Sequence, residues 1–403
     1  MSEWKTYKLG DFITHKKGFA FKSNLYKDTG CPIIRVTNFT GNSISMNDIL
    51  FIDIDQKDNF KEVEIKEDDI IIATVGSWPN NPSSIVGRVI KVPKVANGAL
   101  LNQNAVIIYP NRNLDKKFLY YQLKEKNFSN YLVSGAQGSA NQASIKLEQI
   151  YSYEFAAPED KAKQQQIAQI LTSLDNKIEL NLQMNQTLEA MAQAIFKEWF
   201  VDFKFPGFYG ELVNGLPKGW RMGKLGEEFN LTMGQSPAGS SYNELGEGMV
   251  FYQGRTDFGF RFPTNRLHTT EPKRIAKPLD TLVSVRAPVG DINMANEICC
   301  VGRGLSAVRH KSNAFSFTYY MMKNIEPIFR GFESEGTVFG SINKANFENI
   351  EIIVPEKSII KEFEKIVNPI DNKILENANQ IQTLTQTRDS LLPRLMSGKI
   401  EVK

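Results

Sequence analysis

The chain has 403 residues, of which 41% are hydrophobic and 23% charged, and its formal net charge is +3. This composition is typical of a folded globular protein long enough for two or three domains, and it excludes an intrinsically disordered chain. A net charge this small is compatible with nucleic-acid binding when the basic residues are concentrated on one face.

The sequence predicts a cytoplasmic protein without a membrane partner. No apolar run approaches the roughly 20 residues that a membrane-spanning helix needs. The amino-terminal sequence MSEWKTYKLG lacks the apolar segment of a secretory signal peptide. Three cysteines in the whole chain fit a reducing compartment.

Five segments follow one another along the chain. Residues 1–157 are predicted to form a first globular module, 158–203 a long helix, 204–219 a linker, 220–354 a second module and 355–403 a second long helix. Each helix begins near a Pro-Glu pair, which suits a helix start. The linker is rich in Pro and Gly and has no helical period.

The two long helices are predicted from an apolar seam that recurs at alternating steps of four and three residues, the spacing of a coiled coil. The seam consists of Ile167, Leu171, Leu174, Ile178, Asn181, Leu188 and Ile195 in the first helix, and of Phe363, Val367, Ile370, Ile374, Asn377, Ile381, Leu384, Leu391 and Leu395 in the second.

An internal duplication relates the two halves. The tetrapeptide DNKI begins at Asp175 and again at Asp371, and a shift of 196 residues superimposes the two seams without a gap. The match continues upstream, where WKTYKLG resembles WRMGKLG and ASIKLEQIYSYEFAAPE resembles GSINKANFENIEIIVPE. The sequence thus contains two copies of a module followed by a helix. Within DNKI, the isoleucine is expected in the seam and the three polar residues on the outer face.

We expect an α+β fold in which two pseudo-repeated α/β modules are joined by two long helices paired as an antiparallel coiled coil. This pairing buries the two apolar stripes against each other and gives a pseudo-twofold molecule. Asn181 and Asn377 would then lie close together in a polar layer that fixes the register. The alternative is that each helix packs only on its own module.

Motifs for catalysis or metal binding are absent from the sequence. There is no GxGxxG, no GxxxxGK[ST] and no Asn/Asp-Pro-Pro-aromatic tetrapeptide of the kind that amino-methylating enzymes use. His15, His268 and His310 lack metal-ligand spacing. Glu64 and Lys66 imitate the end of a nuclease motif, but such pairs are common on solvated strands. We therefore predict no catalytic residue, no metal site and no cofactor in this chain.

The predicted loops hold side chains that bond base edges and phosphates, which makes them candidates for DNA binding. The alternative is that they are ordinary polar loop residues. In the first module the candidates are Arg35, Thr37, Asn38, Asn102, Gln103, Asn104, Gln137, Ser139, Asn141 and Gln142; in the second they are Gln253, Arg255, Arg261, Arg266, Arg286, Arg303, Asn343 and Lys344.

The whole chain resembles the specificity subunits of Type I restriction-modification systems. The segments that carry the resemblance are IFKEWFVDFKFPG and LLPRLMSGKI, which close the two helices, together with PEDKAKQQQIAQILTSLDNKI and PLDTLVSVRAPVGDIN. The resemblance implies two target recognition domains on two long antiparallel helices, in agreement with the duplication.

The resemblance also implies a division of labour among subunits. This chain would be non-catalytic and would select an asymmetric bipartite site in double-stranded DNA. Two methylation subunits and motor-endonuclease subunits would be its protein partners and would hold S-adenosylmethionine, ATP and Mg²⁺. Lys177, Glu179, Lys373 and Glu376, which flank the seam, are candidates either for contact with the methylation subunits or for simple solvation.

Two alternatives from other classes of function are weaker, and a third, from the same class, is a close runner-up. A self-contained nuclease or methyltransferase lacks its motifs, and a purely structural coiled-coil scaffold leaves the polar loops unexplained. A third alternative is the specificity component of a related restriction system that cuts on both sides of its site.

Overall fold

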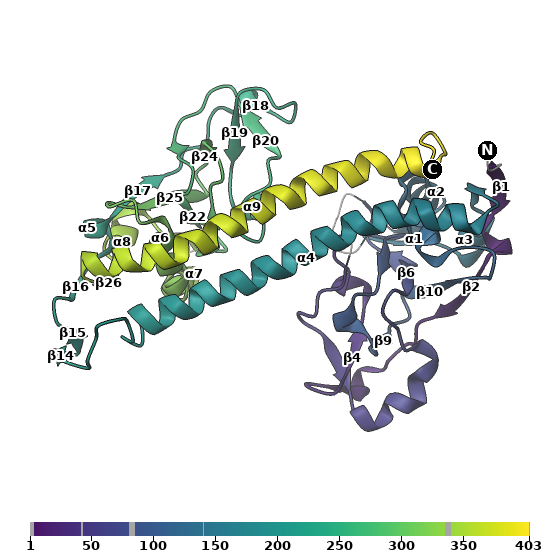
Figure 1. Cartoon of the computed structure of the whole chain (residues 1–403), viewed down its shortest axis with the longest axis horizontal. Helices are drawn as coiled ribbons and strands as arrows, with labels where there is room; N and C mark the ends of the chain where they lie inside the picture. Colours follow the sequence, from purple (N-terminus) through teal and green to yellow (C-terminus); the bar gives the residue numbers. More distant parts are fainter. Residues whose placement is uncertain (1–3, 42, 80–84, 140, 335–339, 403) are drawn as a thin grey trace. The chain divides into compact units, whose positions relative to one another are not determined.

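The computed structural model describes residues 4–41, 43–79, 85–139, 141–334 and 340–402. The chain divides into two compact units, one made of residues 1–178 and 383–403 and the other of residues 179–382. Two helices of 40 residues each pass from one unit into the other (Figure 1): α4 is Lys161–Phe200 and α9 is Lys357–Met396. No helix among the described residues is long and apolar enough to cross a bilayer.

Each unit contains a four-stranded sheet of the same topology. The strand orders are β2-β10-β6-β8 in unit 1 and β17-β25-β22-β23 in unit 2, with all neighbouring strands antiparallel. The strands are β2 Ile13–Lys17, β10 Ala105–Pro110, β6 Ile70–Ala73 and β8 Val89–Lys91, and β17 Phe229–Met233, β25 Leu305–His310, β22 Thr281–Ser284 and β23 Ile292–Met294. The shared topology confirms the duplication.

A second sheet in each unit repeats as well, with one difference. Its order is β3-β5-β4-β9 in unit 1 and β18-β20-β19-β24-β21 in unit 2, so the second module has one additional edge strand. The pairs β4–β9 and β19–β24 are both parallel. The strands are β3 Tyr26–Lys27, β5 Leu50–Ile52, β4 Cys31–Ile34 and β9 Leu100–Leu101, and β18 Tyr242–Asn243, β20 Leu267–Thr269, β19 Met249–Tyr252, β24 Cys299–Val301 and β21 Ile275–Ala276.

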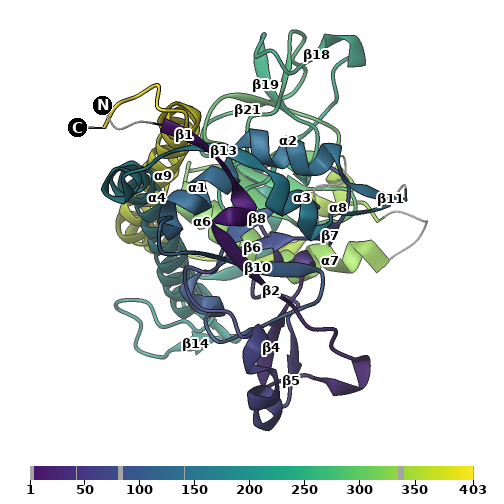
Figure 2. The same cartoon turned by 90° about the vertical axis from the view of Figure 1, so that its right-hand side faces the viewer.

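Shorter elements complete the modules, and in unit 1 the helices α1 to α3 gather at one side of the main sheet (Figure 2). The predicted linker holds a small hairpin, β14–β15. The helices are α1 Lys116–Lys124, α2 Lys126–Ser134, α3 Leu147–Ser152, α5 Leu225–Glu228, α6 Phe315–Asn324, α7 Glu326–Ser334 and α8 Lys344–Glu348. The remaining strands are β1 Trp4–Lys8, β7 Val75–Gly76, β11 Gln137–Ser139, β12 Gln142–Ser144, β13 Glu154–Pro158, β14 Leu212–Val213, β15 Leu216–Pro217, β16 Arg221–Lys224 and β26 Glu351–Val354.

In unit 1 the beginning of α4 lies against the end of α9. Ile167 and Leu171 of α4 share one buried core with Leu395 of α9 and with the module's sheet. Asp175 and Arg388 form an ion pair of 2.8 Å across the two helices. The amino-terminal strand and the carboxy-terminal residues also belong to this unit.

In unit 2 the end of α4 lies against the beginning of α9 around an aromatic core. Phe196 and Phe200 of α4 contact Phe363 of α9, and Phe200 also contacts Phe317 of α6 and Trp220, which precedes β16. The early part of each helix thus pairs with the late part of the other, which confirms the antiparallel arrangement. Packing of each helix on its own module alone is not what the structure has.

A polar layer that contains both Asn181 and Asn377 interrupts the helix pair, as predicted. Asn377 donates to Asn185 over 2.9 Å, and Asn181 donates to Gln380 over 3.1 Å. Asn181 and Asn377 are therefore not each other's hydrogen-bond partners. The position equivalent to Asn185 in the second helix is Ile381, which cannot accept a hydrogen bond. Asn181 takes the neighbouring Gln380 instead.

All sixteen predicted seam residues lie on the covered side of their helices. Half of them are buried: Ile167, Leu171, Asn181, Phe363, Val367, Ile374, Asn377 and Leu395. The other half are partly covered: Leu174, Ile178, Leu188, Ile195, Ile370, Ile381, Leu384 and Leu391. The apolar period therefore located the face of each helix that is hidden from water.

Glu364 of α9 caps the amino-terminal turn of α6, and this contact leads to a testable pH dependence. Its Oε1 accepts the Phe317 N–H over 2.7 Å, while burial raises the pKa of its carboxyl to about 7. A carboxyl whose pKa is raised in the folded state favours folding at low pH, and this contribution is lost as the pH rises through the folded value. Glu364→Gln keeps the acceptor oxygen and removes the charge.

We expect Glu364→Gln to be more stable than the parent protein by about 2 kcal/mol at pH 8 and to match it near pH 4.5. Urea unfolding at both pH values measures this difference. The control is Glu362→Gln, because Glu362 is exposed on the same helix. An equal stability difference between Glu364→Gln and the parent protein at the two pH values would contradict a raised pKa of the Glu364 carboxyl.

Candidate nucleic-acid interface

In the first module, backbone hydrogen bonds bring three candidate segments side by side. The Asn102 N–H donates to the carbonyl of Ile34 over 2.9 Å, directly before the segment that holds Arg35. The Asn104 carbonyl accepts the Thr74 N–H over 2.8 Å. Strand β7, which follows Thr74, pairs with β12 of the polar hairpin β11–β12. Segments that are far apart in the sequence thus lie side by side along one edge of the module.

Most of the candidates along this edge are accessible, and some are structural. Thr37, Gln103, Gln137, Ser139, Asn141 and Gln142 are exposed, and Arg35, Asn102 and Asn104 are half-buried. Asn38 is buried, because its Oδ1 accepts the Arg35 N–H and its amide donates to the Asn47 carbonyl. Asn38 is therefore not accessible to a partner, and its side chain instead stabilises the turn in which it lies.

The second module repeats the same edge with equivalent bonds. The Gly302 N–H donates to the Tyr252 carbonyl over 2.8 Å, and the Gly304 carbonyl accepts the Val285 N–H over 2.9 Å. Arg286 then pairs with Ser341 in an isolated bridge. The candidates Gln253, Arg303 and Arg286 accordingly come together at one edge.

The arginines of the second module differ in how their guanidinium groups are engaged. Arg255 forms an ion pair with Asp291, and Arg266 forms one with Asp257 over 2.8 Å. Arg286 and Arg303 are exposed, and no described residue accepts a hydrogen bond from either guanidinium group. Both are therefore available to an anionic or base-edge partner.

The two remaining candidates of the second module lie at the start of α8. The Asn343 side chain caps this helix by accepting the Asn346 N–H over 2.8 Å. Lys344 is exposed and lies 3.4 Å from Glu348. Asn343 has a structural role that does not depend on a partner.

Arg261 is not an accessible residue, and its prediction as a DNA contact is wrong for this fold. It is 2% exposed, and its guanidinium donates to Glu189 of α4 over 2.5 Å and to Asp371 of α9. The guanidinium also lies 3.5 Å from the ring centre of Tyr319. The charge of Arg261 suggests an accessible surface position, but the arginine, which follows the apolar segment Phe258-Gly259-Phe260, fills a buried space between two helices and its own module.

The aspartate of DNKI has a role that the sequence interpretation missed. Asp175 accepts the Tyr121 hydroxyl over 2.7 Å, and the equivalent Asp371 accepts the Tyr320 hydroxyl over 3.0 Å. Each aspartate also pairs with an arginine, Arg388 in unit 1 and Arg261 in unit 2. The expectation that this residue faces outward is therefore wrong.

One signal in the sequence could have revealed this contact. A Tyr-Tyr pair occurs at equivalent places in both modules, Tyr120–Tyr121 and Tyr319–Tyr320. In each unit the second tyrosine of the pair anchors the module to the DNKI turn of a long helix.

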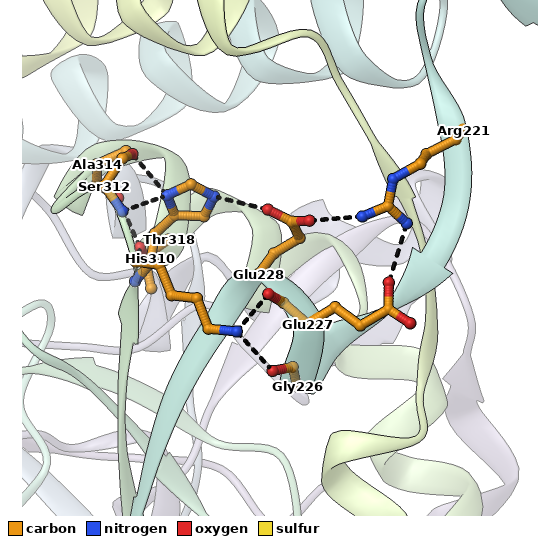
Figure 3. A network of polar contacts seen from close by, with 9 residues as sticks. Arg221, Gly226, Glu227, Glu228, His310, Ser312, Ala314 and Thr318 are labelled. Atoms are coloured by element: carbon orange, nitrogen blue, oxygen red, sulfur yellow. Dashed lines mark hydrogen bonds and ion pairs between the residues drawn. The ribbon is translucent and has the colours of Figure 1, made fainter.

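A polar network fixes the frame of the second module (Figure 3). Arg221 of β16 binds Glu227 over 2.9 Å and Glu228 over 2.7 Å. His310 is buried, and its Nδ1 forms a hydrogen bond of 2.7 Å with the Ser312 hydroxyl. Burial lowers the pKa of His310, although the carboxylate of Glu228, 4.0 Å away, acts to raise it. This histidine is a structural residue. Nowhere in the described part of the chain do three His, Cys, Asp or Glu side chains come together in a group that could hold a metal ion.

The residues beside the seam are accessible to different degrees. Lys177 and Glu179 are exposed on α4. Lys373 and Glu376 of α9 form an ion pair of 2.8 Å with each other. Such an exposed pair contributes little to stability.

Comparison with known proteins agrees with this architecture. A family profile described as "Type I restriction modification DNA specificity domain" matches residues 1–190 and again 217–386. The type I restriction enzyme HindI specificity subunit of Haemophilus influenzae is 28% identical, with 99% of this chain and 100% of that protein covered. A candidate specificity subunit of the type I enzyme MjaX of Methanocaldococcus jannaschii is 29% identical, with 100% and 94% covered.

A solved structure supports the fold. The S subunit of a Type-I restriction-modification system from M. genitalium aligns with a TM-score of 0.59 at 17% identity, covering 100% of this chain and 97% of that one. The profile matches each half of the duplication separately, and together its two matches span most of the chain. The chain therefore belongs to the family of Type I restriction-modification DNA specificity subunits.

Proposed function

We propose that this chain binds double-stranded DNA and recognises an asymmetric bipartite sequence, with one half-site read by each module. The observation that carries the proposal is the repeated edge. In the first module the segments after β4, β6 and β9 meet the hairpin β11–β12, and in the second the segments after β19, β22 and β24 meet the segment of Ser341. The exposed side chains on these equivalent segments differ. Equivalent frames with different side chains are suited to reading two different half-sites. Two related readers whose half-sites lie about one helical turn apart meet the same side of the duplex.

We further propose that the chain is a non-catalytic scaffold for two methylation subunits and for motor-endonuclease subunits. Exposed positions of the long helices, such as Lys177 and Glu179, are candidates for these contacts. S-adenosylmethionine, ATP and Mg²⁺ would be held by the partner subunits, in keeping with the absence of their binding motifs from this sequence. The family relationship supports this assignment.

A module exchange tests the two-reader proposal. Residues 1–157 are replaced with the corresponding module of another family member, the chimera is expressed with its methylation subunit, and methylated adenines are mapped across the genome by single-molecule sequencing. Only one half of the recognised sequence should change. The reciprocal exchange of residues 220–354 should change only the other half.

The structure sets a requirement for the first chimera. The first module packs against Leu395 at the end of α9, and an added Cβ at Gly398 would lie 2.6 Å from the Trp4 ring. The exchanged module must therefore keep side chains of similar size against this end of α9. A folded chimera that changes both halves of the target, or neither, would contradict the proposal, as would a parent protein with no bipartite target.

A further inference from the structure

Gln103 and Arg303 occupy equivalent positions at the tip of the repeated edge. The segment Asn102-Gln103-Asn104 follows β9 and precedes β10, and Gly302-Arg303-Gly304 follows β24 and precedes β25. Both side chains are exposed. One module thus presents a glutamine where the other presents an arginine.

The backbone of each tip is held by the rest of its module. The Gln103 N–H donates to the Phe19 carbonyl over 3.0 Å, and the Arg303 N–H donates to the Ser236 hydroxyl over 3.2 Å. A glycine packs directly against the backbone of each tip and leaves no room for a side chain. A Cβ added at Gly18 would lie 2.0 Å from the Asn102 carbonyl oxygen, and one added at the equivalent Gly234 would lie 2.1 Å from the Gly302 carbonyl oxygen.

The second tip is packed even more closely on its neighbouring segment. A Cβ at Gly302 would lie 2.9 Å from the Gln253 Cα, and one at Gly304 would lie 2.8 Å from the Gln253 carbonyl oxygen. The flanking glycines therefore let the backbone approach the Gln253 segment and leave Arg303 as the one side chain of the tip. A single side chain on a fixed backbone is suited to recognition of a defined base.

The chemistry of the two side chains differs in a way that predicts different bases. Glutamine can bond adenine through its N6 and N7 atoms, whereas arginine bonds guanine through O6 and N7. Neither the Gln103 amide nor the Arg303 guanidinium is engaged by a side chain or carbonyl within the described residues. Arg255 and Arg266, by contrast, are engaged by carboxylates.

We propose that Gln103 and Arg303 are specificity-determining residues, which read an A·T pair in one half-site and a G·C pair in the other. This inference rests on the proposed function, because it assigns bases within the same bipartite site. It adds the prediction that exchanging the two side chain types exchanges the preferred base pair at one position in each half.

The test uses the full chain, co-expressed with its methylation subunit, and maps methylated adenines by single-molecule sequencing. Gln103→Arg should convert one A·T pair of one half-site to G·C, and Arg303→Gln should convert one G·C pair of the other half-site to A·T. Gln103→Ala and Arg303→Ala should relax the same positions, with about a 10- to 100-fold loss of preference.

Matched controls separate a base contact from a general effect of charge. Gln56→Arg makes the first substitution at an exposed position of the first module outside the candidate set, and Arg330→Gln removes the same charge from an exposed position on α7 of the second module. Both controls should leave the recognised sequence unchanged. If the tip variants methylate the parent sequence, or if the controls shift it equally, the inference is overturned while the bipartite site stands. If the parent protein has no bipartite site, the proposed function itself fails.

Discussion

Replacement of Arg261 with methionine is expected to lower the free energy of unfolding of unit 2 by about 3 to 5 kcal/mol, as measured by urea denaturation. The guanidinium is almost fully buried between Glu189 and Asp371. Its removal leaves two carboxylates close together in a poorly solvated space. The large cost comes from these unpaired buried charges. In the parent protein, the attraction between the arginine and the two carboxylates offsets the desolvation of all three groups.

The same variant should acquire a pH dependence. Burial raises the pKa of Glu189, and Arg261 opposes this effect. Without the arginine, the pKa of Glu189 rises further, so the variant loses more stability at pH 8 than at pH 5. The triple variant Arg261→Met, Glu189→Gln, Asp371→Asn should recover part of the loss because it buries no charge.

Arg255→Met is the matched control, since Arg255 also pairs with a carboxylate but its side chain is 48% exposed. Exposed ion pairs contribute at most about 1 kcal/mol. Equal destabilisation by the two substitutions would show that Arg261 is not the buried anchor between the long helices and the second module.

Phe363→Ala is the second substitution for which we expect a loss of about 3 to 5 kcal/mol. The ring is fully buried and contacts Phe196, Trp199 and Phe200 of α4 as well as Tyr320 of α6. Its deletion removes the transfer free energy of the ring and leaves a cavity among rigid aromatic groups, which relax little.

The ring of Phe363 lies where both helices and the second module meet, so its loss should weaken their attachment as well as the global stability of unit 2. Hydrogen exchange would then show earlier opening of α6. The control is Ile366→Ala, three residues further along α9, because this side chain is 45% exposed and should change stability by less than about 0.5 kcal/mol. A Phe363→Ala protein as stable as Ile366→Ala would contradict the packing.

Several properties were determined by the sequence alone. The seam period located the covered face of both helices, and the register of the duplication aligned two modules whose sheets have the same strand order. These predictions succeed because apolar periodicity reports directly which face of a helix avoids water. The family resemblance, carried by segments in both helices and the second module, was confirmed by the profile matches.

Only the tertiary structure decided which polar residues are accessible and which partners they choose. Arg261 and Arg303 are both arginines in polar loops, yet one is buried in a charge network and the other is exposed at a tip. Asn377 donates to Asn185 and Asn181 donates to Gln380, because the antiparallel register sets which positions face each other. Polar side chains have no periodic signal, so their roles depend on contacts between segments that are distant in the sequence.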